Sequence, residues 1–186
     1  GFISISAWFS LLGIMLGVAT LIVVMSVMNG FRTELVDRIL GINGHLIIYS
    51  KNERTIPNYT KIINKILDTP NVVAVTAHLE GQALAKNKNS ISGVIIRGSK
   101  WSDLAAKKIL WKSLNQSTIS NFKDKKNIIM GYRLGQKLNL NVGDYISLIS
   151  PNGMETALGI LPVNQNFKVG GFFDMGMYEY DNNFIF

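Results

Sequence analysis

The chain has 186 residues, and 17% of them are charged, against ~25% in an ordinary soluble domain. Its 19 lysines and arginines and 12 aspartates and glutamates give a net charge of +7, and all of them follow Phe31. This distribution excludes a purely soluble globular protein. The absence of cysteine excludes a disulfide-stapled scaffold and a cysteine-ligated metal site.

The first segment, residues 2–28, is uncharged and mostly apolar, which predicts a membrane-spanning helix. At about 1.5 Å per residue it would measure ~40 Å, more than the ~30 Å of a hydrocarbon core. A secretory signal peptide is the alternative, but its apolar region runs only about 7–15 residues and ends at a small-residue cleavage site. The apolar run here is about twice that length, so a retained span is favoured.

Small and hydroxyl residues of this segment recur every three or four positions, which places them on one face of the predicted helix. Gly13 and Gly17 would let another backbone approach closely. The pattern favours a helix that packs against another protein span over a lone anchor. Charge does not reveal the orientation, because no lysine or arginine precedes the span. The expected packing face comprises Ser6, Ser10, Gly13, Gly17 and Thr20.

The helical pattern continues for two or three turns past the expected lipid boundary. Glu34 and Arg38 stand at the spacing of a favourable ion pair on a helix, and Gly41 is expected to end the helix. We therefore predict a transmembrane helix with a helical extension over residues 1–41 and a separate domain over residues 42–186. The extension would be a rigid stalk that transmits motion, with a plain linker helix as the alternative.

Residues 42–186 alternate short strand patterns with short helix patterns, which predicts an α+β domain. Helices are expected over residues 59–67 and 133–140. A polar turn at residues 86–90 would join two strands, and residues 141–144 would form a tight turn. Strands are expected over residues 45–49, 72–77, 82–85, 91–97, 128–130, 145–149, 167–173 and 183–186.

Charge is uneven along this domain. Residues 81–137 carry 12 basic and 2 acidic side chains, whereas residues 138–186 carry 1 basic and 5 acidic ones. A basic stretch can bind nucleic acid or anionic lipid. Lysine outnumbers arginine 14 to 5 in the whole chain, and no interleaving of aromatic and basic residues recurs. A solvated surface is therefore favoured, and nucleic acid is not expected as a partner.

Sequence motifs for chemistry are weak in this chain. Residues 93–100 are similar to a phosphate-binding loop, but a serine separates the second glycine from the lysine, and the motif requires them to be adjacent. His45 and His78 are the only histidines and have no acidic cluster beside them, which favours structural roles over metal ligation. No nucleophile is paired with a base. We expect no catalytic residue, no metal and no cofactor.

Several stretches carry a resemblance to a known family: residues 13–17, the Val-Met-Asn-Gly-Phe sequence at 27–31, and residues 131–138 and 175–181. They resemble the lipoprotein-releasing ABC permeases LolC and LolE. The Val-Gly-Asp turn at residues 142–144 is shared more widely with MacB-like and FtsX-like relatives. The resemblance implies a MacB-like periplasmic core after one N-terminal transmembrane helix, with later membrane helices absent from this N-terminal fragment.

The resemblance also implies a transport role in the bacterial inner membrane, with the domain in the periplasm. Such permeases pair with a second permease subunit and with a cytoplasmic ATPase subunit. They extract acylated lipoproteins from the membrane lipid and pass them to the periplasmic chaperone LolA. Met25, Met28 and Phe31 are then expected to contact acyl chains, since methionine adapts to irregular apolar ligands. Ordinary helix packing or lipid contact is the alternative for these three residues.

In LolC a protruding hairpin docks the chaperone, and residues 150–166 match it. Residues 157–163 are apolar and uncharged, which suits a docking tip better than a solvated loop. LolE-type chains lack this hairpin, so a LolC-like or combined permease is implied, with a plain hairpin as the alternative. The docking residues expected are Leu158, Gly159, Leu161 and Pro162.

Other functions stay open on the sequence alone. Within the superfamily, a MacB-like exporter or an FtsX-like subunit that transmits a mechanical signal fits the same helix and domain. In a different class, a periplasmic binding module would use the helix only as an anchor. Further membrane spans after residue 186 would favour a permease over the anchored module.

Overall fold

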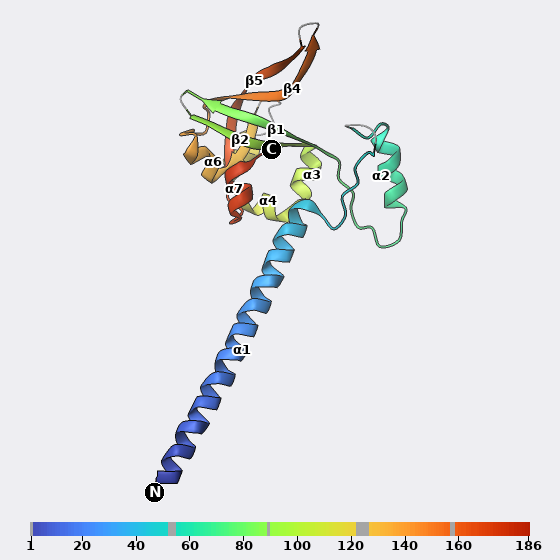
Figure 1. Cartoon of the computed structure of the whole chain (residues 1–186). Helices are drawn as coiled ribbons and strands as arrows, with labels where there is room; N and C mark the ends of the chain where they lie inside the picture. Colours follow the sequence, from blue (N-terminus) through green and yellow to red (C-terminus); the bar gives the residue numbers. More distant parts are fainter. Residues whose placement is uncertain (1, 52–54, 89, 122–126, 157–158) are drawn as a thin grey trace. The chain divides into compact units, whose positions relative to one another are not determined.

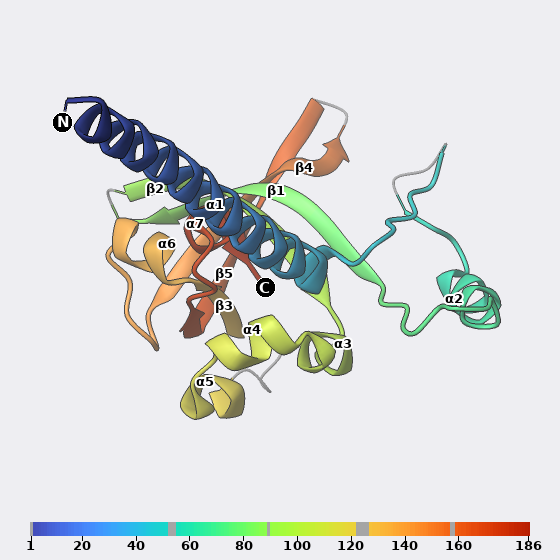
Figure 2. The same ribbon diagram turned by 90° about the horizontal axis from the view of Figure 1, so that it is seen from below.

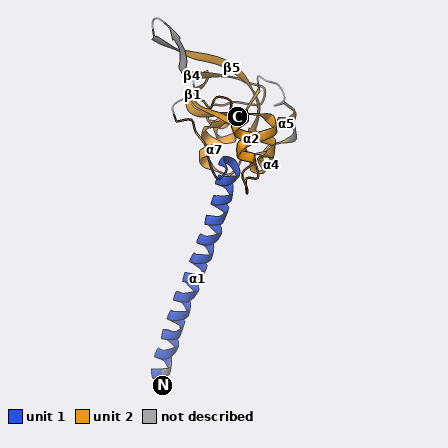
Figure 3. Ribbon diagram, turned by 90° about the vertical axis from the view of Figure 1, so that its right-hand side faces the viewer, with its two compact units in different colours: residues 1–47 blue, residues 48–186 orange. Residues whose placement is uncertain are grey.

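In the computed structural model, the described residues are 2–51, 55–88, 90–121, 127–156 and 159–186. The chain divides into two compact units, Gly1–Ile47 and Ile48–Phe186 (Figure 3). The first unit is one long helix with a short tail. The second contains the strands and the remaining helices.

Helix α1 (Phe2–Asn43) runs without interruption through the predicted span and its extension. The predicted stop at Gly41 is wrong, because the helix continues to Asn43. Gly44 ends it with a positive φ of 79°, and its N–H donates to the carbonyl oxygen of Leu40 at 2.8 Å. A glycine in this left-handed conformation just past the last turn is a common helix C-cap.

The predicted ion pair on α1 is confirmed. Arg38 Nε lies 2.7 Å from Glu34 Oε1, one helical turn away. This ion pair lies in the first charged stretch of the chain, where the surface of α1 changes from purely apolar to a mixture of apolar and charged side chains.

The predicted strands at residues 45–49 and 72–77 are wrong. Neither segment belongs to a strand in the structure, and Leu46 and Val73 are 89% and 96% exposed. A strand requires a partner for its backbone groups, and no described strand pairs with either segment. Between them lies α2 (Tyr59–Leu67), as predicted, and none of its residues is buried. Figures 1 and 2 show α2 set apart from the strands on these two connections.

Six of the described strands form a closed barrel in the order β1-β2-β6-β3-β5-β4. Neighbours are antiparallel except β2 with β6 and β3 with β5, which are parallel. The strands are β1 (His78–Asn87), β2 (Ser90–Ser99), β3 (Asn127–Gly131), β4 (Tyr145–Thr156), β5 (Gly159–Phe173) and β6 (Phe184–Ile185).

The barrel confirms six of the eight predicted strands, although β4 and β5 extend further than predicted. The tight turn before β4 also forms. Asp144 N–H donates to the Asn141 carbonyl oxygen at 3.1 Å, and Asn141 N–H donates to Asp144 Oδ2 at 2.8 Å. An aspartate that bonds a nearby backbone N–H in this way stabilises a turn.

Five short helices accompany the barrel, of which only α6 was predicted. Each has six residues, which is too short for a helical period to show by itself. The pattern at α6 was visible because its apolar positions continue past the helix end to Leu138 and Leu140. Trp101 and Trp111 hold α3 and α4 together, with ring centroids 5.4 Å apart. The helices are α3 (Trp101–Ala106), α4 (Lys108–Ser113), α5 (Gln116–Asn121), α6 (Tyr132–Lys137) and α7 (Tyr178–Asn183).

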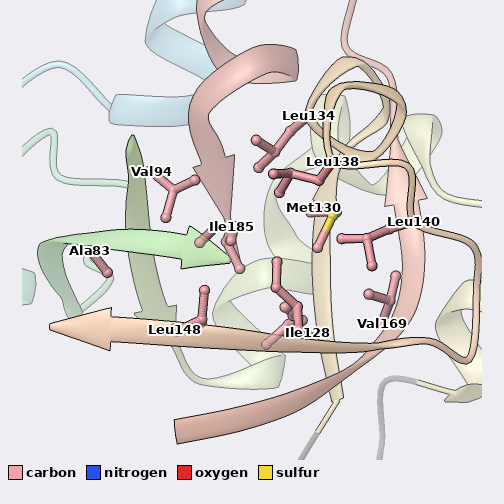
Figure 4. Packing of buried hydrophobic residues seen from close by; sticks show 12 residues of the cluster. Ala83, Val94, Ile128, Met130, Leu134, Leu138, Leu140, Leu148, Val169 and Ile185 are labelled. Carbon is pink, nitrogen blue, oxygen red and sulfur yellow. The ribbon is translucent and has the colours of Figure 1, made fainter. Parts of the chain in front are cut away.

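The core fills the barrel and the space beneath α6 (Figure 4). The side chains of Met130, Leu134, Val169 and Ile185 are 0% exposed. The predicted inward positions around α6 are confirmed, because Leu134, Leu138 and Leu140 are all buried. The mixed helices and strands agree with the predicted α+β class.

Candidate functional site: the apolar helix and the barrel hairpin

The surface of α1 is apolar over most of its length. Phe9, Leu16 and Leu21 are 71%, 65% and 62% exposed. Apolar surface of this extent is unfavourable in water. By length and composition, Ile5–Asn43 is able to cross a membrane.

The continuous helix gathers the predicted packing residues on one side. At about 100° per residue, the five positions from Ser6 to Thr20 fall within an arc of about 80°; we call this side the packing face. A Cβ added at Gly13 or Gly17 would meet no atom within 4 Å. Thr20 Oγ1 donates to the Leu16 carbonyl oxygen at 2.8 Å, so its hydroxyl is satisfied within the helix. The face is smooth and open.

The three predicted acyl-contact residues do not form one cluster. Met25, Met28 and Phe31 are each 60% exposed. By the same helical geometry, Met28 and Phe31 lie within about 40° of the direction of Ser6, whereas Met25 lies about 100° away. Met28 and Phe31 therefore continue the packing face, and Met25 lies outside it. The sequence pattern could have shown this register, since it follows from spacing alone.

The predicted docking stretch is a two-stranded hairpin of β4 and β5. Its pairing runs from Tyr145 with Lys168 out to Thr156 with Gly159. Leu161 pairs with Met154, and Leu158 lies outside the described residues. Figure 1 shows the hairpin extending beyond the other strands of the barrel.

The hairpin is bent by a bulge where it leaves the barrel. Ser150 pairs with Val163, but the next pair is Met154 with Leu161, so residues 151–153 stand opposite Pro162 alone. Pro162 is exposed. Proline has no N–H for the ladder and is tolerated in strands at bulges, and a bulge increases the local twist. This feature explains why the outer hairpin departs from the barrel wall.

An ion pair between a buried arginine and a partly exposed glutamate joins β2 to β1 on the barrel. Arg97 is 5% exposed, and its Nε and Nη2 atoms donate to Glu80 Oε2 at 2.9 and 2.6 Å. Burial lowers the pKa of nearby His78, and the positive charges of Arg97 and Lys107 lower it further. Because His78 lies among cations, a structural role fits it better than metal ligation. Within the described ranges, no group of three or more histidine or acidic side chains could hold a metal.

Comparisons with known proteins decide the family. A family model described as the MacB-like periplasmic core domain matches residues 7–186. The chain belongs to this family. Its fold is therefore that of a MacB-like domain preceded by one apolar helix.

Individual similar proteins point to a narrower group within this family. The lipoprotein-releasing system transmembrane protein LolC of Neisseria meningitidis serogroup B is 32% identical over 98% of this chain and 44% of its own length. LolC of Xylella fastidiosa is 29% identical over 97% of this chain and 44% of its own length. LolE of Haemophilus influenzae is 28% identical over 79% of this chain and 36% of its own length. The predicted resemblance to the LolC and LolE family is confirmed, and the chain spans less than half the length of these relatives.

Proposed function

We propose that this MacB-like domain and its helix belong to a permease subunit that releases acylated lipoproteins from the bacterial inner membrane. The observation that carries the proposal is the similarity to LolC over 98% of this chain, which includes both α1 and the barrel. The subunit pairs with a second permease subunit, and a cytoplasmic ATPase supplies the energy. The domain lies in the periplasm and delivers the lipoprotein to LolA.

The packing face of α1 supports a role in holding acyl chains. A partner helix can approach closely at Gly13 and Gly17, where only small groups stand on the face. Met28 and Phe31 hold the same partner further away, because their side chains project into the interface. Two helices that meet at one end and diverge at the other leave an apolar wedge. Acyl chains fit this wedge, and methionine adapts its shape to irregular apolar ligands.

The continuity of α1 supports mechanical coupling. The helix has no break from Phe2 to Asn43, and no proline interrupts it. A rise of about 1.5 Å per residue gives it a length of ~63 Å, twice the ~30 Å hydrocarbon core. A movement of the wedge is therefore conveyed along one rigid rod to the residues beyond the membrane.

The hairpin of β4 and β5 supports a docking role for the chaperone. It extends beyond the barrel, and its tip sequence is apolar and uncharged over residues 157–163. Pro162 at the bulge is exposed, and a proline blocks continued ladder pairing with another strand. The hairpin thus offers an apolar tip to LolA and limits edge-to-edge association with other sheets.

Reconstitution tests the function. The full-length protein that contains this chain is placed in proteoliposomes with its ATPase and a triacylated lipoprotein, and LolA is added outside. We expect lipoprotein to move into the soluble LolA fraction only when ATP is present. An assembled complex that hydrolyses ATP without releasing lipoprotein contradicts the proposal. Export of a soluble substrate without LolA would instead identify a MacB-like exporter.

Crosslinking tests the docking residues. A photoreactive residue placed at Leu161 or Pro162 should capture LolA. The matched control is Val142, which is 54% exposed at the turn before β4 and should capture none. Failure at every position from 152 to 163, in a complex that still releases lipoprotein, would remove the docking role and leave the transport function intact.

A further inference from the structure

A buried carboxyl group lies in the segment that joins β5 to β6. Asp181, in α7, is 1% exposed. Its Oδ1 accepts the N–H of Met175 at 2.9 Å, but Oδ2 has no hydrogen-bond donor among the described residues. A buried acceptor without a donor is costly, so this oxygen needs an explanation.

The neighbour of Asp181 is a second carboxyl group. Asp174 is a charged neighbour of Asp181. Its Oδ1 accepts the N–H of Gly176 at 3.1 Å, next to the N–H of Met175 that donates to Asp181. Asp174 itself is exposed. Two ionised carboxylates have no proton to donate to one another. Close carboxyl groups, one of them buried, favour one proton held between them.

The pair lies at the point where the barrel closes. A Cβ on Gly131, the last residue of β3, would stand 2.1 Å from the backbone oxygen of Asp181, so α7 presses directly on the end of β3. The closing strand β6 has only two residues, and they pair with Ile95, Ile96 and Met130. Such a short strand depends on the segment before it, which the two aspartates hold in place.

Charged side chains on the elements around the two aspartates interact with residues other than these aspartates. From α6, Arg133 lies over the ring of Tyr178 at 5.5 Å, and Lys137 Nζ bonds Ser92 Oγ at 3.0 Å. From β2, Arg97 bonds Glu80. Strands β3 and β6 carry no ionisable side chain, and Glu179 of α7 is exposed.

The electrostatic surroundings favour the protonated acid. Burial is the first cause that raises the pKa of Asp181, and the charge and hydrogen bond of Asp174 raise it further. The backbone N–H groups of Met175 and Met177 act in the opposite direction. The proton is therefore retained to a higher pH than on an ordinary aspartate.

We propose that Asp174 and Asp181 share one proton and act as a pH-sensitive latch on barrel closure. With the proton in place, the pair holds α7 and β6 against β3. When the proton leaves to solvent, two neighbouring carboxylates remain and repel. The segment over residues 174–186 then loosens, while the rest of the barrel keeps its core.

The direction of the pH effect follows from the raised pKa of Asp181. The folded protein keeps a proton that the unfolded chain releases above about 3.8, so stability falls as the pH rises from there to the folded pKa of Asp181. Within that window, one retained proton changes the folding equilibrium constant by up to ~10-fold per pH unit.

The test uses the full chain in detergent micelles and two amide substitutions. In Asp181→Asn, Oδ1 still accepts from Met175, and the new amide donates to Asp174 at every pH. Asp174→Asn places the same kind of amide donor on the exposed residue of the pair. Because this change is at the surface, the variant should fold more readily than Asp181→Asn. The matched control is Glu179→Gln, which removes a neighbouring exposed carboxyl of the same helix. Chemical denaturation is measured from pH 4 to 9, together with amide hydrogen exchange of residues 174–186.

We expect Asp181→Asn to lose the fall in stability with rising pH. Asp174→Asn should reduce it, because burial still raises the pKa of Asp181. Both variants should keep residues 174–186 protected from exchange at high pH. Glu179→Gln should retain the wild-type fall. A wild-type pH slope in Asp174→Asn overturns the latch, whether or not Asp181→Asn folds. Equal protection of residues 174–186 at pH 4 and pH 9 in the wild type, after correction for intrinsic exchange rates, overturns it as well.

Discussion

The barrel and α1 are both rich in apolar residues, but they place them differently. In the barrel, Met130, Leu134 and Ile185 are 0% exposed, so the protein itself removes them from water. In α1, Leu16, Leu21 and Met28 are 65%, 62% and 60% exposed, so a different apolar medium must cover them. The same hydrophobic effect therefore builds a self-contained core in one region and a surface for lipid or a partner helix in the other.

The largest difference is expected for one leucine-to-alanine change made in each region. Leu134→Ala removes a fully buried side chain and should lower the unfolding free energy by about 3 to 4 kcal/mol, through lost burial and a residual cavity. Leu21→Ala leaves the barrel untouched and should change that free energy by less than about 0.5 kcal/mol. Denaturation in micelles, followed by the fluorescence of Trp101 and Trp111 in a Trp8→Phe background, measures both. Equal effects would contradict the separation of the two regions.

The second difference lies within the barrel and compares two glycines. Gly131→Ala places a Cβ 2.1 Å from a backbone oxygen that cannot rotate away, and it should destabilise the domain by about 2 to 3 kcal/mol through overpacking. Gly93→Ala meets no atom within 4 Å and should be neutral or stabilising by about 0.5 kcal/mol. The same denaturation experiment measures both. A neutral Gly131→Ala would show that α7 does not press on β3 in solution.

The third prediction addresses α1. Gly17→Leu fills the smooth part of the packing face and should weaken association with a partner span by on the order of 1 kcal/mol. Ile22→Leu, on the opposite side, should have no effect. Energy transfer between labelled subunits in a lipid bilayer measures the association. Equal association of both variants would mean that α1 faces lipid all round.

The smallest effect is expected at His78. Its pKa is lowered first by burial and then by Arg97 and Lys107, so the folded protein resists protonation of a group that the unfolded chain protonates near 6.5. Stability should therefore fall as the pH drops below 6.5 towards the folded pKa. His78→Gln should reduce the part of this loss that occurs between pH 8 and pH 5, while His45→Gln, in the exposed segment after α1, should not. An unchanged pH profile in His78→Gln would contradict the electrostatic account.

The sequence predicted long or strongly patterned elements well. α1 and α2 show clear composition or periodicity over nine residues or more, and six strands carry apolar or alternating patterns that the barrel confirms. The Gly41 stop was wrong because any glycine near a helix end suggests a cap, and only the backbone shows that Gly44 takes the left-handed conformation.

The remaining errors have one physical cause, which is that tertiary pairing is invisible in a local pattern. Residues 45–49 and 72–77 have strand-forming side chains, yet they find no partner strand in the structure. The short helices α3, α4, α5 and α7 are fixed by packing, as at Trp101 and Trp111. The Asp174–Asp181 contact was also missed, because acidic residues seven positions apart give no sign that one is buried.

The proposed site was predictable in part. The small residues of the packing face follow from a period of 3.6, and α1 is helical over all of them. Their packing against a partner span stays a prediction. The match of residues 150–166 to a docking hairpin came from the family resemblance, and β4 and β5 form a hairpin there. The spacing also placed Met28 and Phe31 on the packing face and Met25 beside it, although the prediction treated all three alike.

The most direct test of the account is photo-crosslinking from α1 to the acyl chains of a bound lipoprotein in the full-length complex. Met28 on the packing face and Ile22 on the opposite side are 60% and 58% exposed, so they form a pair matched in exposure. The account predicts capture of a radiolabelled acyl chain from Met28 and none from Ile22. Equal capture from both positions, or capture from Ile22 alone, would contradict the claim that the packing face forms the wall of the lipoprotein cavity.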